Sequence, residues 1–389
     1  MRPAYRSWLE ATFWLVSIVI WFLFSDQYFP WWQPLLIWFG FLLIYLITKK
    51  KGNSAQALPF AALLTFLGWF FLYRLDPLWA GLQFQGILLG FCCYLGGLFL
   101  PWAEGELIYL YAGAGLLLLL ATLFFGQWSG GAKAWLALGK LRFQPVEFAR
   151  VFLILFLAAY FAKIPRGQQR FWAFFLLCAV FLVLALQRDL GPALLLFFVV
   201  GSLSLYLSFS WRVLLGYIIT GVFGFWICLS SFSHLRSRVA AWLQPWDYLD
   251  TKGYQVVQGL FAFQAGGVVG RGIGGGLAQI IPASHTDYIF AVIAEEMGLL
   301  GTFSLLIIYL ALAFWGFLIL KNEKDERIRA TGAGLIFLFH FQVLLVLGGM
   351  LRFLPFTGMT LPFVSYGSSS LAAQFWMLGI LTKLGGKRR

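Results

Sequence analysis

Charged side chains are scarce in this sequence. Only 11% of its 389 residues are Asp, Glu, Lys or Arg, whereas 61% are hydrophobic and the mean hydropathy is +0.84. Repeated apolar runs of spanning length therefore indicate a polytopic α-helical membrane protein, and because these runs are continuous rather than alternating they exclude a β-barrel. The net charge of +13 is spread over short loops and chain ends, so membrane topology explains it better than nucleic-acid binding.

Cysteine and histidine are also rare, with four and three residues respectively. The cysteines all fall within apolar runs without metal-ligand spacing, which predicts small packed residues and no disulfide framework. The sequence has no HExxH, Walker or GxSxG motif. These absences exclude the common zinc-hydrolase, P-loop and serine-hydrolase chemistries, and of the histidines only His285, close to Asp287, is a candidate for a site.

The hydrophobic pattern predicts an all-α fold of twelve transmembrane helices. The expected spans are 9–28, 31–48, 57–73, 83–100, 106–125, 146–162, 171–187, 190–208, 212–232, 287–320, 328–350 and 369–384. The segment 287–320 is long for one span, so it is expected to tilt or to extend beyond the bilayer. We expect one integral-membrane unit, divided into residues 1–56, with two N-terminal spans and a basic loop, and a ten-span core over residues 57–389.

Basic residues mark one side of the predicted membrane protein. With the N-terminus inside, the blocks at 49–51, 163–170, 321–327 and 383–389 all face the cytoplasm, which is the positive-inside pattern. Both termini are then cytoplasmic. Two loops, 126–145 and 233–286, lie outside, and the second is too long for a simple connector, so it is expected to carry function.

The tract PASHTDYIFAVIAEEMG, residues 282–298, places Asp287, Glu295, Glu296 and His285 at or inside a span. An acidic residue at membrane depth is by default a functional-site hypothesis, because burying its charge costs about 2.5–3.5 kcal/mol on insertion scales. The alternative is that Asp287 caps the helix and that the glutamates are packed or reach the interface. From the residues alone, neither interpretation is preferred.

Further charged residues lie close to the same outer face. Glu147 and Arg150 are spaced i, i+3 at the start of a span, within ion-pair reach, and serve either as a structural pair or as a substrate contact. Asp189, between two apolar runs, fits both an N-cap and a site residue. The glycine-rich run 270–276 lacks a βαβ context and indicates a flexible or tightly turned loop.

The outer loops also carry an excess of cations, which suits an anionic, lipid-anchored substrate such as a pyrophosphate. Lys133 and Arg142 are candidate contacts for it. For Lys140, Arg238 and Lys252 we favour solvated loop charges.

Five tracts together resemble the SEDS family of shape, elongation, division and sporulation proteins, the RodA/FtsW-like proteins. They lie in the family's order over roughly residues 57 to 384, and they are GAKAWLALGKLRFQPVEFAR (131–150), QRDLGPALLL (187–196), GYQVVQGLFAFQAGGVVGRGIGGG (253–276), PASHTDYIFAVIAEEMG (282–298) and LPFVSYGSSS (361–370). The resemblance implies a ten-span core that acts as a peptidoglycan glycosyltransferase on lipid II, in cell shape or division, with a class B penicillin-binding protein as partner.

The resemblance also assigns roles. Asp287 falls on the family's essential aspartate, the proposed general base, and Glu147 and Asp189 fall on its other two carboxylates. Arg150 stands where Lys is usual, and it is the preferred contact for the undecaprenyl pyrophosphate leaving group, ahead of Lys133 and Arg142.

The sequence departs from the family pattern at several positions, which indicates a divergent member and leaves its subgroup open. Arg188 replaces a proline, Ser368 a glycine and Val346 an asparagine. The chemistry requires no certain cofactor, and a divalent cation stays an alternative.

Two other functions use the same charges: a lipid II flippase, and a non-catalytic scaffold of the cell-wall machinery. A transporter is expected to show internal repeats and charges near the bilayer midplane. This sequence has no clear repeat, and its charges gather at the predicted outer face. The pattern therefore favours the enzyme, and the intact HTD tract at Asp287 argues against a scaffold.

Overall fold

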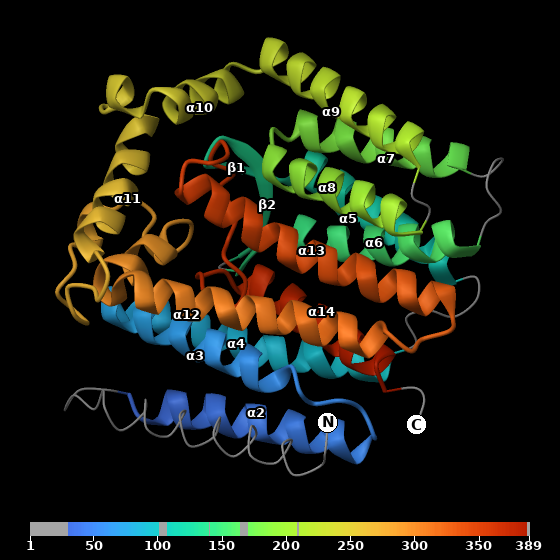
Figure 1. Ribbon diagram of the computed structural model, residues 1–389, viewed down its shortest axis with the longest axis horizontal. Helices are drawn as coiled ribbons and strands as arrows, with labels where there is room; N and C mark the ends of the chain where they lie inside the picture. The colour runs from blue at the N-terminus through green and yellow to red at the C-terminus, as the bar shows by residue number, and fades with distance from the viewer. Residues whose placement is uncertain (1–29, 101–106, 140, 164–169, 208–209, 387–389) are drawn as a thin grey trace.

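The computed structural model describes residues 30–100, 107–139, 141–163, 170–207 and 210–386, and these are mainly helical (Figure 1). Eleven of the twelve predicted spans coincide with helices: α2 (Trp32–Lys50), α3 (Leu58–Leu75), α4 (Pro77–Phe99), α5 (Leu107–Phe125), α6 (Val146–Lys163), α7 (Arg170–Leu186), α8 (Leu190–Leu207), α9 (Trp211–Ser231), α12 (Ile289–Leu320), α13 (Glu326–Met350) and α14 (Ser368–Leu384). The predicted span at 9–28 lies outside the described residues. Eight of the described helices are long and apolar enough to cross a membrane, so the predicted all-α polytopic fold is confirmed.

Helices α4 and α14 pack backbone against backbone because glycines line their contact. A Cβ on Gly97 would meet the carbonyl oxygen of Trp376, and one on Gly379 would meet the carbonyl oxygen of Tyr94. Small residues allow this approach in membranes, where dispersion contacts and not the hydrophobic effect hold helices together. Figure 1 shows α14 within the bundle, surrounded by α4, α12 and α13.

Helix α2 packs closely on the core formed by the later helices. Phe41 makes an edge-to-face contact with Phe91, with ring centroids 5.0 Å apart. The Thr48 hydroxyl lies 2.8 Å from the Tyr94 hydroxyl, a hydrogen bond between buried groups. The division of the chain at residues 56 and 57 stays a prediction.

The segment 126–145 is more structured than the loop that we predicted. It contains the strands β1 (Gln127–Ser129), β2 (Ala132–Leu138) and β3 (Leu141–Phe143), which form an antiparallel sheet in the order β1-β2-β3. Ser129 pairs with Ala132, and the two residues between them, Gly130 and Gly131, have φ of 60° and 87°. Positive φ at both positions is what a tight hairpin turn requires, and glycine provides it without strain.

The long segment 233–286 also contains regular structure. It holds α10 (Ser233–Leu243), the 3₁₀ turn η1 (Pro245–Tyr248), α11 (Lys252–Gly266) and the 3₁₀ turn η2 (Ala278–Ile280). Figure 1 shows α10 and α11 (yellow to gold) outside the parallel set of helices, forming an arch at one end of the bundle.

The predicted long span does not run as one straight helix. Within α12, Gly298 has φ 66° and ψ −165°, which interrupts the helix and leaves a continuous stretch from Leu299 to Leu320. Val268 and Gly270 pack against this point, where a Cβ would meet their backbone. The extra length therefore forms a kinked extension that begins just after Asp287.

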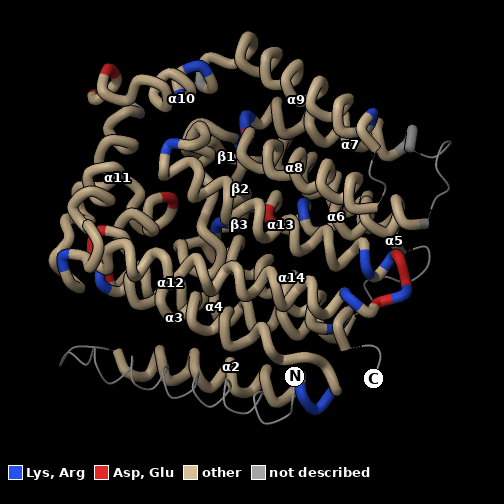
Figure 2. The backbone as a smooth tube through the Cα atoms, in the orientation of Figure 1, with Lys and Arg blue, Asp and Glu red and all other residues tan. Residues whose placement is uncertain are grey.

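Charges gather at the two ends of the bundle and leave the middle mostly free of charge (Figure 2). The loops that join α2 to α3 and α12 to α13 lie at one end and carry the basic blocks. The loops with the sheet, α10 and α11 lie at the other. The basic blocks of these loops therefore lie at one end of the bundle, and the orientation of this end in the membrane stays a prediction.

Candidate active site

Asp287 lies in the turn that leads into α12, and a second loop holds this turn in place. The Ser365 hydroxyl donates to the carbonyl of Thr286 at 2.6 Å, and the Tyr366 amide donates to the carbonyl of His285 at 2.9 Å. Both donors belong to the tract LPFVSYGSSS, whose residues 361–365 are buried. The irregular backbone of this tract is therefore buried in protein, which is one of the two environments where a membrane protein tolerates non-helical backbone.

The Asp287 carboxylate is partly buried at this membrane edge. Burial raises its pKa to about 6, against the opposing effects of a hydrogen bond from Thr286 and of the positive charge of Arg238. A Cβ placed on Gly358 would lie 3.8 Å from Asp287 Oδ2, so glycine leaves room beside the carboxylate. A carboxyl group that titrates close to neutral pH is suited to accept a proton.

Asp189 is a second carboxyl group of this region. It lies between α7 and α8, and its Oδ2 is buried without a hydrogen-bond partner among the described residues. Burial and the nearby Glu147 raise its pKa to about 6, while Arg238 and Arg150 lower it. The preceding Arg188 has a φ of 59° and extends over the ring of Trp128, 5.2 Å from its centroid.

Glu147 and Arg150 form the ion pair that their spacing predicts, on the first turns of α6. The Arg150 side chain is 0% exposed, and its Nη2 also donates to Gln342 Oε1 at 2.8 Å. Its Nε and Nη1 have no hydrogen-bond partner in the described part of the chain. Arg150 thus lies beneath the surface of the site, and Gln342 is a contact that the sequence analysis missed.

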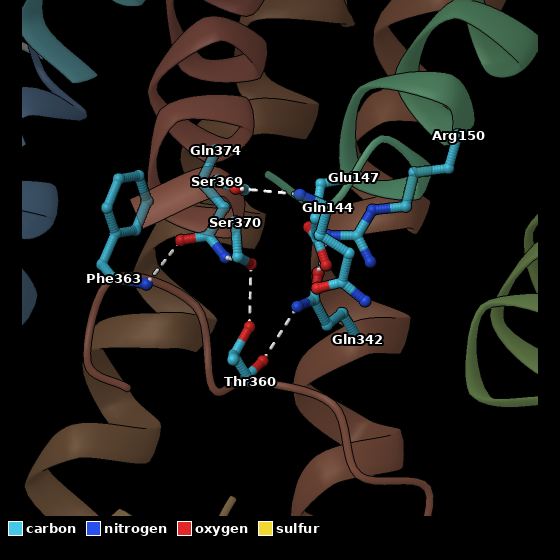
Figure 3. A network of polar contacts seen from close by, with 9 residues as sticks. All are labelled: Gln144, Glu147, Arg150, Gln342, Thr360, Phe363, Ser369, Ser370 and Gln374. Carbon is cyan, nitrogen blue, oxygen red and sulfur yellow. Dashed lines mark hydrogen bonds and ion pairs between the residues drawn. The ribbon is translucent and has the colours of Figure 1, made fainter. Parts of the chain in front are cut away.

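A network of polar contacts extends from this pair to α14 (Figure 3). Gln342 Nε2 donates to the carbonyl of Thr360 at 2.8 Å, and the Thr360 hydroxyl donates to Ser370 Oγ at 2.8 Å. Gln374 donates to the same Ser370 oxygen at 2.9 Å and accepts from the Phe363 amide at 2.7 Å. The network ties α6, α13 and α14 to the loop beside Asp287.

The other predicted substrate contacts lie apart from this network. Lys133 donates through Nζ to the carbonyl of Leu123 at 2.6 Å, which caps the C-terminal end of α5. Arg142 is exposed in β3. His285 stacks on Trp79 with ring centroids 4.1 Å apart, and burial lowers its pKa.

Arg238 is a site residue that the sequence analysis missed, and its interpretation as a solvated loop charge is wrong. It lies half-buried on α10, and burial lowers its pKa while Asp189 and Asp287 raise it. Its Nη1 donates to the carbonyl of Thr357 at 3.4 Å. The two aspartates therefore face a common cation that comes from the outer segment.

Glu295 and Glu296, in contrast, organise the glycine-rich loop. Glu295 pairs with Arg271 at 3.1 Å and accepts from the Leu277 amide, and Glu296 accepts from the Gly274 amide at 2.9 Å. The loop is tightly turned, with φ near 84° at three of its glycines, Gly270, Gly272 and Gly274. This supports the structural alternative for the two glutamates.

Neither a metal cluster nor a disulfide is found within the described ranges. No group of three or more His, Cys, Asp or Glu there could hold a metal ion. The four cysteines are free, and Cys92 and Cys178 are exposed, so the prediction that all four are packed residues is wrong for these two.

Comparisons of the sequence and of the fold with known proteins point to the same family. The family model of the FtsW, RodA and SpoVE cell cycle proteins matches residues 54–389. A peptidoglycan glycosyltransferase RodA of Mycobacterium leprae is 33% identical over 277 residues, which are 67% of this chain and 59% of that protein. A probable peptidoglycan glycosyltransferase FtsW of Pseudoalteromonas translucida is 34% identical, over 77% of this chain and 78% of its own length.

Two solved structures share the architecture. One is a chain of a peptidoglycan synthase complex that coordinates polymerization and crosslinking, with a TM-score of 0.75, 31% identity, and coverage of 86% of this chain and 97% of that one. The other is the rod shape determining protein RodA of Thermus thermophilus, with a TM-score of 0.66, 28% identity, and coverage of 87% and 98%. The chain spans about 59% of the length of the mycobacterial relative, although it covers nearly all of these two structures.

Proposed function

The chain belongs to the FtsW, RodA and SpoVE family of cell cycle proteins, and on this basis we propose that it is a peptidoglycan glycosyltransferase that polymerises lipid II. It is a bacterial membrane protein with many spans. In the proposed orientation, the site lies at the outer face of the cytoplasmic membrane and both termini lie inside. A class B penicillin-binding protein is the proposed partner, in line with the synthase complex that shares this fold.

The observation that carries the proposal is the environment of Asp287. The turn that carries it is held by two hydrogen bonds to the carbonyls of the preceding residues, and burial raises the pKa of its carboxyl group to about 6. At neutral pH the group is ionised, yet it is a stronger base than a solvated aspartate. These are the properties of a general base for an alcohol nucleophile.

In the proposed reaction, Asp287 removes the proton of the 4-hydroxyl of the acceptor GlcNAc as its oxygen attacks C1 of the donor MurNAc. The bond between C1 and the pyrophosphate oxygen breaks, and undecaprenyl pyrophosphate leaves with the electron pair. A single displacement inverts the anomeric centre. No second carboxylate is needed to activate water, because the acceptor takes the place of water.

Glu147, Arg150 and Asp189 support this site from the side of α6 and α8. Arg150 holds its charge beneath the surface and lowers the pKa of Asp189, which lies near it. We propose that this buried pair fixes the start of α6 beside the site.

Purified lipid II tests the proposal. Wild type and Asp287→Asn are compared for glycan polymer, each with and without the coexpressed class B penicillin-binding protein. Polymer from the wild type alone supports the assignment of the base. Equal polymer from both removes Asp287 from catalysis, and no polymer from folded wild type with its partner bound favours the flippase or the scaffold.

A further inference from the structure

The position of α10 depends on contacts with the loop that follows α13. Arg352 donates through Nε to the carbonyl of Trp242 at 2.8 Å and through Nη2 to the carbonyl of Leu243 at 2.7 Å. The indole of Trp242 donates back to the Arg352 carbonyl at 3.0 Å. A cation thus satisfies the last carbonyls of α10 and fixes the helix end over this loop.

Arg238 lies one turn before Trp242, so these contacts place it above Thr357 and Gly358. Three parts of the site converge on this short backbone segment. Arg238 donates to the Thr357 carbonyl, Asp287 lies beside Gly358, and a Cβ on Gly191, close to Asp189, would lie 3.0 Å from the Thr357 oxygen. The geometry therefore places the guanidinium close to both aspartates.

Arg238 nevertheless keeps most of its donors available. Its hydrogen bond to Thr357 is long, at 3.4 Å, and among the described residues no carboxylate lies within ion-pair distance of it. A half-buried guanidinium has five N–H donors in a planar fork that matches the oxygens of a phosphate. Such a group can bind an anion without giving up an ion pair.

Two of the other cations considered for an anionic substrate are less available. The ammonium of Lys133 is bonded to carbonyls at the end of α5. Arg150 is 0% exposed and paired with Glu147, so a ligand would reach it only after a rearrangement. Arg238 is only half-buried and lies near Asp287.

We infer that Arg238 binds the diphosphate group of the lipid-linked donor, beside Asp287. The inference rests on the proposed function and names the contact for its leaving group. The inference also accounts for the change of charge during the reaction. When Asp287 takes the acceptor's proton it becomes neutral, and as the C1–O bond breaks the leaving diphosphate gains a negative charge. The Arg238 cation stays in place, and the anion that it stabilises changes from the Asp287 carboxylate to the leaving diphosphate.

A binding assay on the full-length protein in neutral-lipid nanodiscs tests the inference separately from catalysis. Undecaprenyl diphosphate is the probe, and inorganic pyrophosphate is the competitor that shares the diphosphate but lacks the lipid. We expect Arg238→Gln to weaken binding about tenfold or more, because a charge-assisted contact is lost. Arg238→Lys keeps the charge without the fork and should fall between the two.

Arg236→Gln is the matched control, because Arg236 is exposed on the same helix and its loss removes the same charge. It should bind like the wild type. Equal affinity of Arg238→Gln and wild type, in a wild type that polymerises lipid II, would overturn the inference and leave the proposed function intact. If the wild type neither polymerises lipid II nor binds the diphosphate, both fail. If Arg238→Gln does not fold, Arg238→Lys is compared with the wild type instead. Equal affinity of these two proteins for undecaprenyl diphosphate and for inorganic pyrophosphate would overturn the role of the guanidinium fork.

Discussion

Replacing Glu147 by glutamine should destabilise the protein strongly, because it leaves the charge of Arg150 buried without its counter-ion. Arg150 is 0% exposed, and its Nε and Nη1 already have no partner in the described part of the chain. After Glu147→Gln, the guanidinium keeps its hydrogen bond to Gln342 but has no carboxylate within ion-pair distance among the described residues. Breaking a buried pair from one side costs about 3–5 kcal/mol.

A double-mutant cycle separates this effect from lost packing. Arg150→Met removes the cation with a side chain of similar length, and Glu147→Gln/Arg150→Met removes both charges. The double variant should lose about 2–3 kcal/mol less than the sum of the single losses, because neither charge is then left unpaired. The free energy of unfolding is measured by detergent denaturation in mixed micelles, followed by tryptophan fluorescence.

Asp250→Asn is the control, since it removes an exposed carboxylate from the outer segment. It should change the free energy of unfolding by less than about 0.5 kcal/mol. A loss below about 1 kcal/mol for Glu147→Gln, or single losses that simply add, would refute the reasoning. Arg150 would then reach water or another anion after the substitution.

Three further predictions concern the pH dependence, the helix packing and the outer loop. Polymerisation should rise with pH through about 6 and then level off, since the pKa of Asp287 is raised and its basic form exists only above it; a flat profile from pH 5 to 8 would contradict this. Gly97→Ala should lower the thermal midpoint, at a cost of about 1–3 kcal/mol, whereas Gly96→Ala, with nothing within 4 Å of its Cβ, should not; equal effects would disprove the close contact with α14. Glu295→Ala should make external trypsin cleave after Arg271 roughly tenfold faster, because the loop loses an ion pair and the Leu277 amide loses its acceptor; unchanged cleavage in intact cells would contradict either the role of Glu295 or the outer location.

Hydropathy was sufficient for the membrane-spanning helices, because each must satisfy its own backbone within an apolar run. It gave no signal for the sheet, whose outer strands have only three residues each, nor for α10 and α11, which lie outside the predicted spans. Their sequences are too polar to be marked by a membrane window. The outer segment therefore required the tertiary structure.

The candidate site was predictable where its contacts are local. Glu147 and Arg150 are one helical turn apart, so their pairing follows from spacing alone. Arg238 was misjudged because its environment comes from segments distant in the sequence, around Asp189 and Asp287. A charged residue in a long loop gives no sign of which residues the loop will bring to it.

Buried glutamines were a signal that the sequence offered and that was not used. An amide within an apolar span must find partners, and three buried glutamines find one in the irregular loop between α13 and α14. Gln83 on α4 donates to the Ser365 carbonyl at 3.1 Å and accepts from the Gly367 amide at 3.2 Å. Gln342 and Gln374 bind the same loop from α13 and α14.

This loop is therefore held by three helices on one side, while on the other it fixes the residues around Asp287. Ser365 bonds the Thr286 carbonyl, and Gly358 lies beside the aspartate itself. Each buried backbone group of the loop that had no hydrogen-bond partner would destabilise this conformation by about 1–3 kcal/mol. A loop with several such groups would rearrange and would not hold the base in place. The glutamine side chains buried in the spans provide these hydrogen bonds. The position of the base is therefore determined by the packing of the helices that carry them.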